Sequence, residues 1–309
     1  MDKKQVYSAQ VSLLTKILPI MSKQTQFALK GGTAINLFIR NMPRLSVDID
    51  LVYLPLDSRD KAIANIKSGL DELAINLERA NFKIVKAYQS KENTMRLTVS
   101  DSKVSVKVEL SPVMRGTVHK EYAAQACDKV QEQFGFLEVS LVSFEDLYAG
   151  KICAALGRQH PRDLYDIKVL LENEGITDKL RLTTIIYLLC SNRPLSELLN
   201  PNLFDISEVF NTQFADMTEH SVSVDELVEA RMNLINGLKS SFTDNEKAFM
   251  LGFKQRKPDW SLLKKTTRDI NISNIEALPA IKWKLLNLKK MNADKHKLAV
   301  DKLEAVLNA

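Results

Sequence analysis

The sequence has few cysteines and no long hydrophobic run. These absences argue against a disulfide-rich, a zinc-stabilised or a membrane-spanning protein. Its three cysteines, Cys127, Cys153 and Cys190, are far apart and odd in number, so they predict reduced thiols and a cytoplasmic protein. None stands near a histidine at zinc-site spacing, which argues against structural zinc. No apolar run approaches the ~20 residues that span a bilayer. The first residues lack a small-residue cleavage site and predict an amphipathic helix, so we expect no membrane partner.

Several familiar catalytic patterns are also missing. The sequence contains no P-loop and no G-x-S-x-G motif. Its four histidines are scattered, and none stands beside a candidate nucleophile. We also find no internal repeat and no low-complexity tract. These absences leave acidic and basic side chains as the candidates for chemistry.

The composition is that of a globular protein with unevenly placed charge. With 309 residues, 45% of them hydrophobic and 26% charged, the chain is long enough for two domains. From Lys254 to the end it has 13 Lys/Arg and 6 Asp/Glu, a net charge of +7, so the remainder of the +5 chain carries −2. This basic region indicates either a polyanionic partner or only a solvated, lysine-rich helical surface.

The chain changes character near residue 143. Before that point, helical spacing predicts a helix over 57–80, and alternation predicts strands over 82–88, 94–100, 103–110 and 137–142. The spacers Glu92-Asn93 and Asp101-Ser102 favour antiparallel hairpins. After it, the pattern predicts helices over 144–157, 162–174, 178–191, 224–240, 244–253, 280–291 and 294–307. We therefore predict an α+β protein with a mixed-sheet domain over 1–142 and a mostly helical domain over 143–309.

The strongest local signal is the segment Asp48-Ile49-Asp50. Two aspartates two residues apart in a strand project from one face, with Ile49 on the other. Adjacent carboxylates repel, and a divalent cation relieves that repulsion. Oxygen ligands alone favour Mg²⁺ or another hard ion such as Mn²⁺. The alternative is an edge strand with two solvated aspartates.

A glycine pair precedes this strand. Gly31-Gly32-Thr33 follows a strand-like segment and opens an apolar run. Glycines let the backbone approach a ligand closely, and a helix start attracts phosphate. Thr33 can add a hydrogen bond or cap the helix. Most Gly-Gly pairs mark only a turn, so the signal lies in the combination with the aspartate pair.

Glu109 supplies a possible third acid. It lies on the polar face of a valine-rich strand beside Lys107. Three carboxylates from neighbouring strands could hold two divalent ions, which clamp the oxygens of a phosphoryl displacement. The alternative is a surface patch formed by Lys107 and Glu109.

A lysine and two aspartates form the last candidate group. Lys151 falls within an apolar stripe of the helix that Ser143 is expected to cap, so its charge requires a partner unless it extends to solvent. Arg158 follows on the same side and could reinforce the positive charge. After Pro161, Arg162 and Asp163 open the next helix, and Arg162 could pair with Asp166.

In this order the motifs resemble the polymerase-beta-type nucleotidyltransferase superfamily and, more closely, the AbiEii/AbiGii toxin family. The resemblance rests on Gly31-Gly32-Thr33, Arg44-x-Ser46-x-Asp48-Ile49-Asp50, Lys107-x-Glu109, Lys151 and Arg162-Asp163-Leu164-Tyr165-Asp166. It implies a nucleotidyltransferase-type sheet domain. It also implies metal ligands at Asp48, Asp50 and Glu109, and catalytic roles for Lys151, Asp163 and Asp166. The two aspartates of the last motif would either orient Lys151 or act as a general base.

The remaining implied contacts are to nucleotide, from Gly31, Gly32, Thr33, Arg44, Ser46, Lys107, Arg158 and Arg162. The resemblance further implies a toxin of a type IV toxin–antitoxin or phage-defence (abortive infection) system, with a nucleoside triphosphate as substrate. A tRNA acceptor would suit the basic C-terminal region. The cognate antitoxin would be encoded nearby and could act without stable contact. The alternatives are a nucleotide- or RNA-binding module that has lost activity, and a kinase-like phosphoryl transferase.

Overall fold

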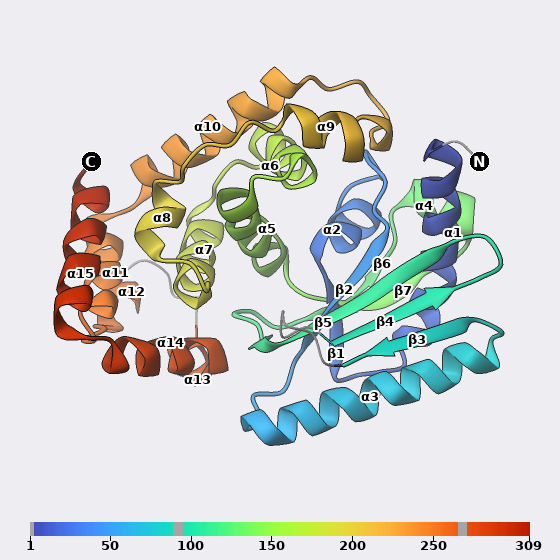
Figure 1. Cartoon of the computed structure of the whole chain (residues 1–309), viewed down its shortest axis with the longest axis horizontal. Coiled ribbons are helices and arrows are strands. Elements are labelled where there is room, and N and C mark those ends of the chain that lie inside the picture. The colour runs from blue at the N-terminus through green and yellow to red at the C-terminus, as the bar shows by residue number, and fades with distance from the viewer. Residues whose placement is uncertain (1–2, 89–94, 265–270) are drawn as a thin grey trace. The chain divides into compact units, whose positions relative to one another are not determined.

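The computed structural model describes residues 3–88, 95–264 and 271–309, which form two compact units (Figure 1). Unit 1 comprises Met1–Leu147 and Phe214–Ser221, and unit 2 comprises Tyr148–Gln213 and Val222–Ala309. The first division between them falls within helix α5 (Phe144–Arg158).

A mixed sheet lies at the centre of unit 1. Seven strands of the described chain form it, in the order β3-β4-β5-β2-β1-β7-β6. Pairing is parallel between β2 and β5 and between β1 and β7, and antiparallel between the other neighbours. The strands are β1 (Phe27–Lys30), β2 (Asp48–Tyr53), β3 (Lys83–Ala87), β4 (Met95–Ser100), β5 (Ser105–Arg115), β6 (Tyr122–Gln125) and β7 (Glu138–Leu141).

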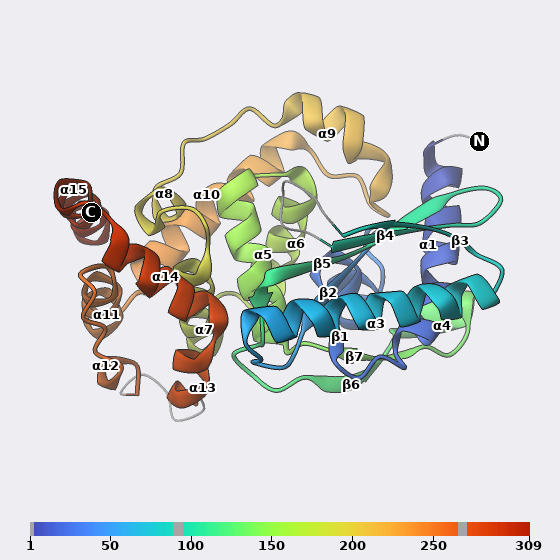
Figure 2. The ribbon, with the colours of Figure 1, turned by 60° about the horizontal axis from the view of Figure 1, so that its bottom comes forward.

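Two long helices of unit 1 supply much of its apolar core. Helix α1 (Lys3–Met21) and helix α3 (Arg59–Arg79) contact each other, and both contact β5. The buried positions of α3 recur every three or four residues, and Figure 2 shows α3 running along the sheet. Val106, Val108 and Leu110 of β5 are buried while the residues between them are more exposed, so one face of the sheet is apolar and the other polar. The expected amphipathic helix near the N-terminus is confirmed.

Unit 1 also contains short elements. They are α2 (Gly31–Ala34), the π-helical turn η1 (Ile35–Ile39), α4 (Asp128–Phe134) and the 3₁₀ turn η2 (Ala215–Met217). The segment that includes η2 pairs with 43–45: the Leu45 N–H donates to the Met217 carbonyl at 2.7 Å, and the Glu219 N–H to the Pro43 carbonyl at 2.9 Å. Residues far along the chain therefore fix the backbone beside Arg44.

Unit 2 is helical in its described residues. Its helices after α5 are α6 (Pro161–Asn173), α7 (Asp178–Cys190), α8 (Leu195–Leu199), α9 (Ser207–Gln213), α10 (Val224–Ser241), α11 (Asp244–Lys254), α12 (Ser261–Lys264), α13 (Ile272–Ala277), α14 (Pro279–Lys290) and α15 (Ala293–Asn308). A buried ion pair joins α7 to α11, with Arg181 Nε 3.0 Å from a Glu246 carboxylate oxygen. Glu246 also completes the capping box with Thr243 that begins α11.

The α+β class predicted from the sequence is confirmed, including the long helices and the strands of the central hairpins. The β4–β5 hairpin turns at Asp101-Ser102 as expected. The other expected spacer, Glu92-Asn93, lies outside the described residues. Cys127, Cys153 and Cys190 are free thiols. In the described part of the chain, no helix is both long and apolar enough to cross a bilayer.

Candidate active site

The candidate acids of unit 1 share the polar face of the sheet. Parallel pairing of β2 with β5 places Asp48 opposite Lys107, and Asp50 opposite Glu109. Paired positions of neighbouring strands lie on the same face, about 5 Å apart. Ile49 points the other way and is fully buried. Sequence positions separated by some 60 residues are thus brought together by strand register.

A row of four charged residues crosses this face. Lys30 of β1 lies opposite Asp50, and Arg96 of β4 lies opposite Glu109. Two neighbouring acids are therefore flanked by one basic residue on each side. Arg96 Nε donates to Glu109 Oε1 at 2.5 Å, which offsets the repulsion between Glu109 and Asp50. Lys30 and Arg96 could not be identified from the sequence pattern, because only the strand order shows that they extend the row.

The carboxylates fit a metal ion bound together with a substrate. Within residues 3–88, 95–264 and 271–309, no three His, Cys, Asp or Glu side chains gather closely enough to hold an ion by themselves. Glu109 is instead bonded to Arg96. Mg²⁺, however, commonly takes one or two carboxylates and completes its shell with water and substrate phosphates. Asp48 and Asp50 suit that arrangement, because they lie on one face of β2.

Gly31 is packed directly against one of these acids. Its φ is +78°, a left-handed conformation, and a Cβ built on it would lie 2.3 Å from Asp50 Oδ2. A side chain at this position would therefore displace the carboxylate as well as strain the backbone. At Gly32 a Cβ would lie 2.9 Å from Arg44 Nη2 and 3.1 Å from Ser46 Oγ. Gly31 is thus favoured by both its positive φ and its contact with Asp50, whereas a side chain at Gly32 would require the end of the Arg44 side chain to shift.

Replacement of Gly31 by alanine tests this packing. We expect the free energy of unfolding to fall by about 1–2 kcal/mol from the positive φ alone, with a further loss from the clash with Asp50. Gly135→Ala is a matched control, because Gly135 has a φ of +86° and no atom within 4 Å of the added Cβ. Chemical denaturation of both variants measures the difference. Equal losses would show that Asp50 is not held against the glycine.

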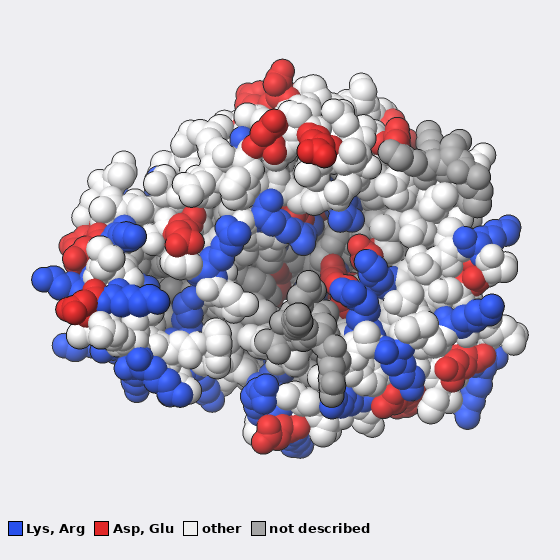
Figure 3. All heavy atoms as spheres, in the orientation of Figure 1, with Lys and Arg blue, Asp and Glu red and all other residues white. Residues whose placement is uncertain are grey.

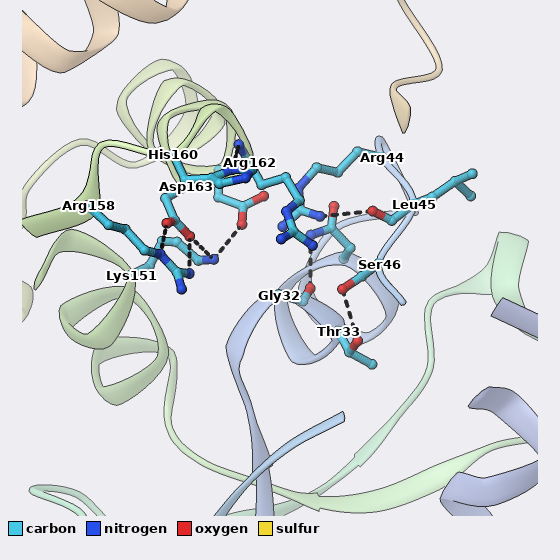
Figure 4. A network of polar contacts seen from close by, with 12 residues as sticks. Gly32, Thr33, Arg44, Leu45, Ser46, Lys151, Arg158, His160, Arg162 and Asp163 are labelled. Carbon is cyan, nitrogen blue, oxygen red and sulfur yellow. Dashed lines mark hydrogen bonds and ion pairs between the residues drawn. The ribbon is translucent and has the colours of Figure 1, made fainter. Parts of the chain in front are cut away.

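Thr33, Ser46 and Arg44 form a buried polar group beneath the glycine turn (Figure 4). Thr33 Oγ1 lies 2.9 Å from Ser46 Oγ and 2.5 Å from the Asp48 carbonyl oxygen. Arg44 Nη1 donates to the Leu45 carbonyl at 2.9 Å. The Thr33 hydroxyl therefore ties the glycine turn to the start of β2.

In unit 2, one lysine lies between two aspartates. Lys151 Nζ is 2.8 Å from Asp163 Oδ1 and 3.0 Å from Asp166 Oδ2, and all three side chains are buried. Arg158 binds the other side of Asp163, with Nε 2.5 Å from Oδ2 (Figure 4). The charge of Lys151 is thus balanced by aspartates of the following helix rather than carried to solvent. The Arg158 side chain remains 66% exposed.

Asp163 remains ionised despite its burial. Burial is the largest effect and would raise the pKa of Asp163, but the charges of Lys151 and Arg158 together with their hydrogen bonds outweigh it and hold the pKa well below its usual range. An efficient general base has a pKa near the working pH. Asp163 is therefore better suited to orienting the two cations than to accepting a proton.

The start of α6 fixes where Asp163 lies. His160 Nδ1 accepts a hydrogen bond from the Arg162 N–H at 3.1 Å, so this histidine caps the helix, and Pro161 occupies the first turn. Burial, followed by the charge of Arg162, lowers the pKa of His160 and favours the neutral ring that can accept this bond. The sequence pattern had given His160 no role. A residue directly before a helix-starting proline is the signal that could have identified the cap.

The model of the family described as "Nucleotidyl transferase AbiEii toxin, Type IV TA system" matches residues 12–263. The chain belongs to the AbiEii toxin family. The resemblance expected from the sequence motifs is therefore confirmed, as is the assignment of the protein as a nucleotidyltransferase.

A solved structure supports the same architecture. The structure of MenT4, nucleotidyltransferase toxin Rv2826c from Mycobacterium tuberculosis H37Rv, matches with a TM-score of 0.62 over 93% of this chain and 95% of that one. The sequence identity is 12%, so this likeness shows the fold alone. No curated protein sequence matches the chain significantly.

In this AbiEii-family chain, the candidate residues fall into two groups. Unit 1 carries those on the polar face of the sheet and around the glycine turn, namely Gly31, Gly32, Thr33, Arg44, Ser46, Asp48, Asp50, Lys107 and Glu109. Unit 2 carries those of α5 and α6, namely Lys151, Arg158, Arg162, Asp163 and Asp166. Each motif named in the sequence thus belongs to a local cluster, and both groups lie within the region matched by the family.

Proposed function

We propose that this nucleotidyltransferase toxin moves a nucleoside monophosphate from a nucleoside triphosphate to an RNA acceptor, with Mg²⁺ or Mn²⁺ as the metal. The observation that carries the proposal is the packing of Gly31 against Asp50 beside Asp48. Close backbone approach and paired carboxylates are the two features needed to bind a metal–triphosphate complex.

Asp48 and Asp50 would hold the metal, and Glu109 could join them through the carboxylate oxygen that Arg96 does not bind. When bound, the metal would neutralise charge on the phosphates and orient the acceptor oxygen for in-line attack. Gly31 and Gly32 would place backbone N–H groups near the phosphates. Thr33 and Ser46 would hold the shape of this turn, and Lys107 would add positive charge on the same face.

We assign the unit 2 cluster to the same reaction on the strength of family membership. Lys151 would stabilise charge that develops on the phosphates. Asp163 and Asp166 would orient it, and the exposed Arg158 and the partly exposed Arg162 would contact the nucleotide. In this division of roles, unit 1 acts as the nucleotidyltransferase domain and unit 2 as a helical domain that supplies the lysine.

For the acceptor we propose tRNA, and the outer face of α14 as one of its contacts. Helix α14 carries four lysines and no acidic residue. Trp283 and Leu286 are 45% and 48% exposed, and helical spacing places Lys282, Lys289 and Lys290 on the same side of α14. In Figure 3, basic side chains are frequent over the region where Figure 1 places α11 to α15. Lysines that contact phosphates around an aromatic ring available for stacking suit single-stranded RNA.

The fourth lysine of α14, Lys284, contacts the end of a neighbouring helix. Lys284 Nζ donates to the Ser191 carbonyl at 2.5 Å, which anchors α14 to the end of α7. Burial, followed by the neighbouring charge of Lys254, lowers the pKa of Lys284. Burial likewise lowers the pKa of Lys254. A bound polyanion would offset the positive charge that α14 carries.

The combined substitution Lys282→Gln, Lys289→Gln and Lys290→Gln tests this surface. We expect tRNA binding to weaken and the slope of log affinity against log salt to fall by about 2, because each phosphate contact on a single strand contributes about 0.7. The control replaces Lys295, Lys297 and Lys302 of the adjacent α15, where Asp294, Asp301 and Glu304 interleave with the lysines. Equal changes in both triple variants, measured by filter binding at several salt concentrations, would indicate non-specific attraction.

Incubation with labelled nucleoside triphosphates, Mg²⁺ and total tRNA tests the proposed function. We expect the wild type to label RNA and Asp48→Ala to leave it unlabelled. Equal labelling by both, or none by the wild type, would remove the proposal. Induced expression adds a second readout, because a toxin should arrest growth and Lys151→Ala should relieve the arrest. A binding module without activity would be tolerated.

The biological setting follows from the family. As a toxin of a type IV system, the chain is expected to have an antitoxin encoded nearby. We propose that the antitoxin counteracts it without stable contact, that both act in the cytoplasm where tRNA is found, and that the system serves in phage defence by abortive infection. Co-expression with the neighbouring gene, followed by purification, tests whether a complex forms.

A further inference from the structure

The corner between α5 and α6 contains a glutamine in a conformation unusual for that residue. Gln159 has a φ of +50° and is 1% exposed. A left-handed conformation costs a residue with a side chain about 1–2 kcal/mol. Burial adds the requirement that its amide be hydrogen-bonded. The surrounding contacts must therefore outweigh both costs.

Both the nitrogen and the oxygen of the Gln159 side-chain amide form hydrogen bonds. Its Nε2 donates to the Asn202 carbonyl at 2.7 Å. Its Oε1 accepts from the Phe204 N–H at 3.2 Å and from Arg231 Nη1 at 2.8 Å. Arg231 Nη1 also donates to the Phe204 carbonyl at 2.8 Å. One side chain thus joins the α5–α6 corner, the segment after α8, and α10.

Arg231 is an unusual partner for a neutral amide. It is 5% exposed, and no carboxylate pairs with it in the described part of unit 2. Burial accordingly lowers the pKa of Arg231. A buried guanidinium costs much less when its N–H groups donate to well-placed oxygens. The oxygens shown for Arg231 belong to Gln159 and Phe204, so its burial depends on the corner keeping its shape.

The two sequence neighbours of Gln159 both help to hold the cluster formed by Lys151, Asp163 and Asp166. Arg158 binds Asp163 with Nε 2.5 Å from Oδ2. His160 caps α6, the helix whose first turns carry Asp163 and Asp166. A shift of the corner would therefore move Arg158 and the start of α6 together. These are the contacts that keep Asp163 against Lys151.

We propose that Gln159 and Arg231 are positioning residues, which fix the α5–α6 corner so that Asp163 stays paired with Lys151. The effect on catalysis rests on the proposed function, whereas the effect on how readily Lys151 is reached by a reagent does not. The corner sets the orientation of a charge that must be in place before reaction, so its loss lowers turnover more than nucleotide binding.

Gln159→Gly is the informative variant, because glycine suits the positive φ and removes only the amide contacts. The full-length chain is treated with an amine-reactive reagent, and labelling of Lys151 is followed by mass spectrometry relative to exposed Lys302. We expect Lys151 to label at least about tenfold faster in Gln159→Gly, through local opening of the corner. Gln159→Glu keeps the acceptor for Arg231 and is expected to label at a rate closer to wild type. In the transfer assay, kcat should fall by about 10- to 100-fold with little change in the KM for nucleotide.

Glu246→Gln is the matched control, since it disturbs the buried pair with Arg181 elsewhere in the same unit. It should lower the free energy of unfolding without exposing Lys151. The proposal is overturned if Gln159→Gly labels like the wild type, or if Glu246→Gln exposes Lys151 equally. Should the wild type transfer no nucleotide, the proposed function fails, while the labelling experiment still decides the role of Gln159.

Discussion

Replacing Lys151 by alanine is expected to lower nucleotidyl transfer by about 10²- to 10³-fold, the usual effect of removing one preorganised electrostatic contact. The same change leaves Asp163 and Asp166 buried without the cation they share. Breaking a buried ion pair from one side costs about 3–5 kcal/mol. Transfer assays and chemical denaturation therefore both report on this variant.

A double variant separates the two effects. Lys151→Ala with Asp166→Asn restores the charge balance of the cluster, so we expect stability to recover in part while transfer stays low. Lys168→Ala on α6 is a surface control, because Lys168 pairs with Glu172 and Glu226 near solvent. It should cost at most about 1 kcal/mol and leave transfer unchanged. Full transfer by the stable double variant would show that Lys151 is structural only.

Asp48→Asn is expected to be as damaging to transfer, about 10²- to 10³-fold, for a different reason. Asparagine keeps the shape of the side chain but removes the charge that attracts a divalent ion. The Mg²⁺ concentration needed for half-maximal transfer should rise. Because Asp48 is only half-buried, the free energy of unfolding should change by less than about 1 kcal/mol.

Asp60→Asn serves as the comparison for Asp48→Asn. Asp60 lies in the first turn of α3, with its side chain 98% exposed, and takes no part in the polar face of the sheet. Stability, transfer and Mg²⁺ dependence should all match the wild type. An Asp48→Asn protein with normal Mg²⁺ dependence would show that this carboxylate does not hold the metal.

The long elements could be predicted from sequence, because their pattern repeats several times. The buried apolar positions of α3 and the alternation in β5 each report a buried face over many residues. Strand β6 and helices α8 and α9 span only four to seven residues, too short to show a period. The return of Phe214–Ser221 to unit 1 depends on backbone pairing with residues 43–45, which side-chain patterns do not encode.

Some residues of the candidate site could likewise be predicted from sequence, and others could not. Asp48 and Asp50 could be found because strand geometry places alternate residues on one face. The sequence also showed that Lys151 needs a partner and offered Asp163 as one that could orient it. Arg96 and Lys30 were missed because their proximity to the acids depends on strand order. Gln159 was missed because its importance comes from a positive φ and from contacts more than forty residues away.

The most direct test is to compare transfer from nucleoside triphosphates labelled at the α- or the γ-phosphate, using wild-type protein, Mg²⁺ and total tRNA. Nucleotidyl transfer predicts that the α-label appears in RNA while the γ-label leaves with pyrophosphate, and that Asp48→Asn lowers labelling by about 10²- to 10³-fold. Appearance of the γ-label in RNA would instead show phosphoryl transfer on the same scaffold and would contradict the account.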